Sequence, residues 1–165
     1  MVKLAKKTNA KKYSSQPEQL EHVFYEPQRI IAKLRNAGAD DDTIKQAVVD
    51  YITNERQKCI DDVAYFAAHY GFVVGRGSSG IIPFEIEQYQ DDLLKSFQND
   101  KYVIVNKSRQ LGVSTVLVFY ALWFSIFSTG KRCLVVAHRR ESAEEFITKL
   151  KTAYEFLPDW LKPSC

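Results

Sequence analysis

The sequence predicts an α/β fold in which a parallel sheet follows an N-terminal helical region. Two short apolar runs rich in β-branched residues, at 102–105 and 133–137, predict buried parallel strands. A strongly apolar segment at 114–128 lies between them and predicts the helix that connects parallel strands. The order of strand, loop, helix, strand and helix is typical of a βαβ unit with a right-handed crossover.

The composition is that of an ordinary globular protein. The chain has 165 residues, of which 45% are hydrophobic and 26% are charged, so a buried core is expected rather than disorder. No apolar run reaches the roughly 20 residues that a membrane span needs, and no apolar segment follows the first lysines as in a secretory signal. The three cysteines are far apart and lack the spacing of zinc ligands, so reduced thiols are expected. The sequence therefore predicts no association with a membrane.

Three regions follow from the charge and glycine patterns. Residues 1–25 are expected to form a disordered basic tail, since the first 17 residues include five lysines and no acidic residue. Such a tail could contact nucleic acid or simply be solvated. Residues 26–71 form the helical region, and a cluster of glycine and serine at 71–80 separates it from the main domain, residues 72–165.

Helix signals divide the helical region into three helices. Pro27 suits a first helical turn and Gly38 a helix end, while the aspartates at 40–42 suit the start of the second helix. This pair resembles a helix-turn-helix, but its second helix has acidic residues and few basic ones to meet DNA. Packing or docking of a partner subunit is therefore favoured. A third helix is expected at 61–70.

The main domain alternates between extended and helical patterns. Residues 81–84 are expected to be extended, since a residue that precedes a proline avoids the helical region. Three amphipathic or apolar segments predict helices at 86–98, 114–128 and 141–156, the last closed by Pro158.

The loop at 107–115 stands between a predicted strand and a predicted helix, where helix amides favour bound phosphate. The usual pattern of a phosphate-binding loop is G-x-x-x-x-G-K-[ST]. Gly112 and Ser114 match its second glycine and its hydroxyl, but Val113 takes the place of the lysine and Lys107 that of the first glycine. Lys107 and Arg109 could supply the missing charge. The alternative is an ordinary strand-to-helix turn with two solvated cations.

Residues 107–115, KSRQLGVST, resemble the deviant Walker A loop of the large terminase subunits of tailed bacteriophages. Two further stretches are similar to that family. Residues 82–84 with Tyr89 and Gln90 resemble the segment in which a glutamine contacts adenine, and residues 154–161 resemble the family's stretch around L-P-D-W-L. The resemblance covers residues 60–163 and implies a partial P-loop NTPase fold of the ASCE type, truncated before the Walker B strand.

The resemblance also implies roles for these residues. Lys107 would neutralise the β- and γ-phosphates of ATP, and Arg109 would contact the γ-phosphate. Gly112 would let the backbone approach phosphate, and the amides of Val113 and Ser114 would bind it. The Ser114 hydroxyl would help hold Mg²⁺, with Thr115 beside it. Gln90 would read adenine and Tyr89 would stack on it. The remaining loop residues assigned to the nucleotide are Ser108, Gln110 and Leu111.

The function implied is that of the ATPase portion of a DNA-packaging motor. In the family, ATP hydrolysis drives double-stranded DNA into a procapsid, with a small terminase subunit and a portal protein as partners. The full protein would form a homo-oligomeric ring in the host cytoplasm and act transiently at the portal.

A carboxylate motif that ATP hydrolysis needs is missing from this sequence, and two other functions remain open. No apolar run ending in Asp-Glu follows residue 115, so the chain is expected to be the N-terminal part of a longer terminase or a truncated product, with little hydrolysis alone. Another helicase-like P-loop NTPase remains an alternative. So does a non-catalytic terminase fragment that binds a partner subunit or DNA.

Overall fold

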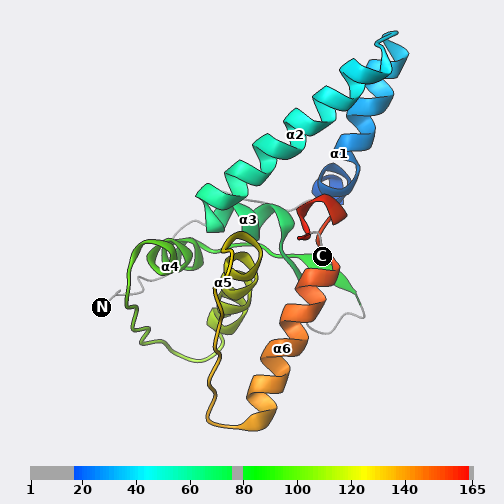
Figure 1. Ribbon diagram of the computed structural model, residues 1–165. Helices are drawn as coiled ribbons and strands as arrows, with labels where there is room; N and C mark the ends of the chain where they lie inside the picture. The colour runs from blue at the N-terminus through cyan, green and yellow to red at the C-terminus, as the bar shows by residue number, and fades with distance from the viewer. Residues whose placement is uncertain (1–16, 76–79, 164–165) are drawn as a thin grey trace.

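The computed structural model describes residues 17–75 and 80–163, with side chains from residue 26 onward. Over these residues the fold is mostly helical, and a two-stranded antiparallel hairpin is the sheet that they form (Figure 1). The elements, in chain order, are α1 (Pro17–Asn36), α2 (Asp41–Asp61), α3 (Val63–Tyr70), β1 (Phe72–Val74), β2 (Ile81–Pro83), α4 (Gln88–Asn99), α5 (Val113–Phe127), α6 (Arg140–Glu155) and the short 3₁₀ helix η1 (Asp159–Leu161).

The α1–α2 pair forms an antiparallel helical hairpin that extends away from the remaining helices (Figure 1). Helix α1 begins at Pro17, ten residues earlier than the sequence predicts, and Pro27 lies inside it. A proline at the first helical position loses no hydrogen bond, because the first amides of a helix have no intrahelical partner. The N-cap of α2 is confirmed, since the Asp40 carboxylate accepts a hydrogen bond from the Thr43 amide. Residues 1–16 of the predicted tail lie outside the described residues.

Helix α3 and the β-hairpin connect this pair to the rest of the fold. The Asp62 carboxylate caps α3 by accepting hydrogen bonds from the amides of Ala64 and Tyr65, at 2.8 and 3.1 Å. Strand β1 then pairs with β2 in antiparallel register, with Phe72 opposite Pro83. The extended conformation predicted at 81–84 is thus confirmed for β2, whereas β1 was not predicted from the sequence.

The predicted parallel sheet is wrong. Neither the run at 102–105 nor the run at 133–137 forms a strand, and neither pairs with a strand of the described residues. Their outward residues are almost fully exposed, at 81% for Tyr102, 79% for Ile104, 86% for Leu134 and 83% for Val136. An apolar β-branched run indicates an extended backbone, but a strand also needs a neighbour to take its hydrogen bonds.

The helices of residues 80–163 occur where the sequence predicts them, and the core is formed mainly by side chains of helices. Helices α4, α5 and α6 match the predicted helices to within two residues. Their apolar faces meet α3 in a cluster of buried side chains that contains residues from both sides of residue 71, including Phe66, Leu93 and Phe119. Val103 and Val105 pack against this cluster from one side. The α/β class predicted from the sequence, a partial P-loop NTPase fold with a parallel sheet, is therefore wrong. The described residues form a helical core with a two-stranded antiparallel hairpin.

Candidate functional site

The loop at 107–112 leads directly into α5, as the sequence predicts for its candidate site. Gly112 is the N-cap of α5 and adopts the left-handed conformation, with φ +66°. Gln110 also has a positive φ, 65°, which is uncommon for a residue with a side chain. Gln110 and Gly112, with Leu111 between them, are both left-handed, and together they bend the chain sharply into the helix. The backbone of the loop is therefore bent close to the helix start, where amides are exposed.

The first turn of α5 leaves several amides without a helical partner. The Gly112 carbonyl accepts hydrogen bonds from the amides of Thr115 and Val116, at 2.9 and 3.1 Å. The earlier amides, those of Val113 and Ser114, precede the first intrahelical bond. Within residues 17–75 and 80–163, no side chain caps this end of the helix by a hydrogen bond. The α5 N-terminus therefore presents free N–H groups and the positive end of the helix dipole together.

Helix α4 holds the loop in this conformation. The Tyr89 hydroxyl donates to the Leu111 carbonyl at 2.7 Å, and the Gln90 amide nitrogen donates to the same carbonyl at 3.2 Å. The Gln90 side-chain oxygen accepts from the backbone amide of Glu87 at 3.0 Å, as part of a capping box. A Cβ on Gly112 would lie 2.7 Å from the Gln90 amide nitrogen. The structure therefore requires glycine at this position for both its conformation and its space.

The two residues predicted to contact adenine lie beside the loop, but their polar atoms face it. Gln90 is only 5% exposed, and both ends of its side-chain amide have partners within the protein. The Tyr89 hydroxyl is likewise engaged by the Leu111 carbonyl. Partial burial raises the pKa of Tyr89, so its hydroxyl stays protonated as a donor near neutral pH. The geometry thus gives Tyr89 and Gln90 the role of positioning the loop.

The cationic residues of the loop point to solvent. Lys107, Ser108 and Arg109 are exposed, and within the described residues no ion pair engages Lys107 or Arg109. Exposed cations of this kind can turn toward an anion at low cost. Lys107 and Arg109 lie six and four residues before Val113, the first residue of α5.

The rest of the loop divides between the core and the surface. Leu111 packs against the core cluster and Val113 is buried, so these two side chains fix the loop to the protein. Ser114 is exposed and Thr115 is half-buried. The residue in the usual lysine position, Val113, cannot approach a ligand with its side chain, so only its amide is available.

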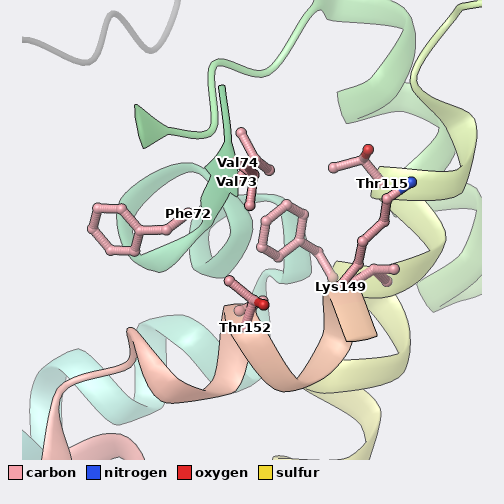
Figure 2. Close-up of a pocket in the computed structure, with 9 residues that line it drawn as sticks. Phe72, Val73, Val74, Thr115, Lys149 and Thr152 are labelled. Atoms are coloured by element: carbon pink, nitrogen blue, oxygen red, sulfur yellow. The ribbon is translucent and has the colours of Figure 1, made fainter. Parts of the chain in front are cut away.

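A pocket that the sequence did not indicate opens beside the first turn of α5. It has a volume of about 260 Å³ and lies between β1, α5 and α6 (Figure 2). Figure 2 shows Lys149 rising from α6 toward the turn of α5 that contains Thr115. The residues that line the pocket are Phe72, Val73, Val74, Thr115, Val118, Phe119, Lys149, Thr152 and Ala153. Except for Thr115, none of these was a candidate, because apolar residues on a strand and a helix face predict only packing.

The charged residue that lines this pocket, Lys149, forms an ion pair with another residue of α6. The Lys149 ammonium donates to Glu145 at 2.6 Å, one turn earlier on α6. That hydrogen bond and the charge of Lys149 hold the pKa of the exposed Glu145 carboxyl below its usual value. Lys149 is 47% exposed and lies at the pocket rim.

The described residues contain no group of three or more His, Cys, Asp or Glu side chains that could hold a metal ion. Ser114, the one metal ligand predicted from the sequence, is exposed and lies on the first turn of α5. Mg²⁺ bound with a nucleotide takes several of its ligands from phosphate oxygens and water. A single hydroxyl from the protein is compatible with that mode of binding.

Comparison of the sequence with known protein families adds no information about the site. A search of known protein families finds none whose profile matches this sequence. Among the described helices, none is both long and apolar enough to cross a membrane.

Proposed function

We propose that residues 107–115 bind the polyphosphate chain of ATP at the N-terminus of α5. The observation that carries this proposal is the left-handed Gly112 at the helix start, which precedes the free amides of Val113 and Ser114. A phosphate placed there would accept backbone hydrogen bonds and interact with the helix dipole. The proposal rests on this loop and does not require a parallel sheet.

Charge neutralisation in this proposal comes from the exposed cations of the loop. Lys107 supplies the ammonium that the usual lysine position, occupied by Val113, lacks. Arg109 adds a guanidinium whose planar fork suits two phosphate oxygens. Ser114 supplies a hydroxyl to the Mg²⁺ that accompanies the nucleotide. When bound, that ion neutralises charge on the β- and γ-phosphates.

The wider function proposed is that of the ATPase part of a bacteriophage DNA-packaging motor. The support is the resemblance to large terminase subunits of three stretches, which occur in the family's order along the chain. They are residues 82–84 with Tyr89 and Gln90, residues 107–115 and residues 154–161. The structure adds a physical link between two of these stretches, because Tyr89 and Gln90 hold the carbonyl of Leu111. Double-stranded DNA, the small terminase subunit and the portal protein would be the partners of such a motor, which would work as a ring.

Lys107→Ala is expected to weaken binding of inorganic tripolyphosphate by at least about tenfold, because one charge-assisted contact to phosphate is worth roughly 1.5–3 kcal/mol. Isothermal titration of the 165-residue chain with tripolyphosphate, at low salt and with Mg²⁺, measures the change. The matched control is Lys131→Ala, which removes the same charge at the opposite end of α5, where Lys131 lies over the ring of Phe124. Equal losses in the two variants would contradict the proposal, because they would show that the net charge alone attracts the anion.

A further inference from the structure

The pocket between β1, α5 and α6 has the chemistry of a site for an aromatic ring. Its walls are mainly apolar and include the side chains of Phe72 and Phe119. The Phe119 ring is itself fixed, since it packs against the ring of Phe84 with centroids 4.7 Å apart. Polar groups occur at Thr115, Thr152 and Lys149. An apolar cavity with a few polar groups is the usual form of a small-molecule site.

The pocket is large enough to hold part of a drug-sized ligand but not all of it. Pockets that bury complete drug-sized ligands measure roughly 300–1,000 Å³, and this one measures about 260 Å³. A planar ring system would fill it, and the remainder of the molecule would extend out past the rim.

One residue that lines the pocket, Thr115, lies next to the proposed phosphate site in the sequence. Thr115 belongs to the first turn of α5, and its amide bonds to the carbonyl of Gly112 at 2.9 Å. Val118 and Phe119 lie three and four residues further on, on the same helix face, at a rise of about 4.5–6 Å along the helix axis. The pocket thus starts within one helical turn of the amides that face phosphate.

We propose that this pocket receives the base of the nucleotide whose phosphates bind at the start of α5. The base lies against Phe119 and β1, and the ribose passes Thr115 and Lys149 at the rim. Gln90, whose side-chain amide is already bonded to Leu111 and Glu87, positions the loop instead of reading the base. This inference rests on the proposed function and adds the location of the base.

The test compares ATP with tripolyphosphate on a variant with a filled pocket. Thr152→Phe places a ring in the cavity from α6. The matched control is Thr148→Phe, the same substitution one turn earlier on α6, at an exposed residue that does not line the pocket. Thr152→Phe is expected to weaken ATP binding at least tenfold and to leave tripolyphosphate binding within twofold of the unmodified chain. Thr148→Phe should change neither.

The outcomes separate this inference from the proposed function. Equal effects of Thr152→Phe on ATP and tripolyphosphate, or no effect on either, would overturn the base pocket and leave the phosphate site standing. If the unmodified chain binds neither ligand, both proposals fail.

A second measurement does not depend on the fold of a variant. Photolabelling of the unmodified chain with 8-azido-ATP, followed by peptide mapping, should label β1 or α6 at residues 72–74 or 152–153. Labelling at 88–92 instead would contradict the inference.

Discussion

Gly112→Ala is expected to destroy the phosphate site and to destabilise the chain. A side chain at φ +66° costs roughly 1–2 kcal/mol in the left-handed region. The new Cβ would also lie 2.7 Å from the amide nitrogen of Gln90, so Gln90 would have to move away from the Leu111 carbonyl. The free energy of unfolding should fall by about 2–4 kcal/mol in total. Tripolyphosphate affinity should fall more than tenfold, because the loop and the amides of α5 would no longer be aligned.

A matched control isolates the steric part of that effect. Gly130 has nearly the same conformation, with φ +72°, and nothing lies within 4 Å of a Cβ placed there. Gly130→Ala therefore has the backbone cost without the collision, and it lies beyond the C-terminal end of α5. Chemical denaturation and tripolyphosphate titration of both variants measure the difference. Similar stability and similar affinity in the two variants would show that the contact between Gln90 and Gly112 does not define the loop.

Glu55→Ala is expected to destabilise the chain by about as much as Gly112→Ala. Glu55 is 7% exposed, and its carboxylate accepts hydrogen bonds from the hydroxyls of Tyr65 and Tyr70, both at 2.9 Å, and from Lys58 at 2.6 Å. Alanine would leave two hydroxyls in or near the core without an acceptor, which costs about 2–4 kcal/mol. Asp50→Ala is the control, since Asp50 is an exposed acid of the same helix that accepts from Gln46. Urea denaturation should show little change in the control.

The same residue gives stability a defined dependence on pH. Burial raises the pKa of Glu55, but the hydrogen bonds from Lys58, Tyr65 and Tyr70 together outweigh it and leave the pKa below its usual value. A lowered pKa in the folded state means that the stabilisation is complete above the usual pKa of a glutamate. It is lost as the pH falls through the folded-state value. The stability difference between the unmodified chain and Glu55→Gln should therefore shrink below about pH 4.5. A difference that is constant from pH 7 to pH 3 would exclude this linkage.

Glu55 also explains how the helical region joins the rest of the fold. Its partners Tyr65 and Tyr70 lie on α3, and the ring of Tyr70 meets Trp160 of η1 edge to face, with centroids 5.6 Å apart. The neighbouring Arg56 donates to the carbonyls of Trp160 and Leu161. Residues 160–161, part of the stretch at 154–161 that resembles the terminase family, therefore hold the segment after α6 against α2 and α3.

The sequence predicted the helices well because each carries its own signal. The apolar face of α4, the continuous apolar run of α5 and the aspartate at the start of α2 are local features that act within one helix. The parallel sheet required more than local information. A run such as 102–105 indicates an extended backbone, but whether it pairs depends on a second segment at the right distance, which no local pattern encodes.

The candidate site could be predicted only in part, because its loop has a local motif whereas its contacts depend on the packing of several elements. The motif located the loop, and the structure places Gly112 in the left-handed conformation at the start of α5. The resemblance also brought Gln90 and Tyr89 to attention, and both lie against the loop. Their bonds to the Leu111 carbonyl depend on how α4 packs beside α5, so the role of these two side chains became visible only in three dimensions. The pocket lined by Phe119 and Lys149 comes from three separate elements and has no signature in the sequence.

The most direct test of the phosphate site is an amide NMR titration of the ¹⁵N-labelled chain with inorganic tripolyphosphate and Mg²⁺. The N–H groups of Gly112, Val113 and Ser114 should show the largest shifts, because they lie at the unpaired start of α5 and would donate to phosphate oxygens. Amides at the start of α6, from Arg140 onward, are the internal control, since the N-cap of this helix is the extended residue Arg139 and not a left-handed glycine. Shifts that are equal at the two helix starts, or largest near the exposed lysines far from α5, would contradict a phosphate site in this loop.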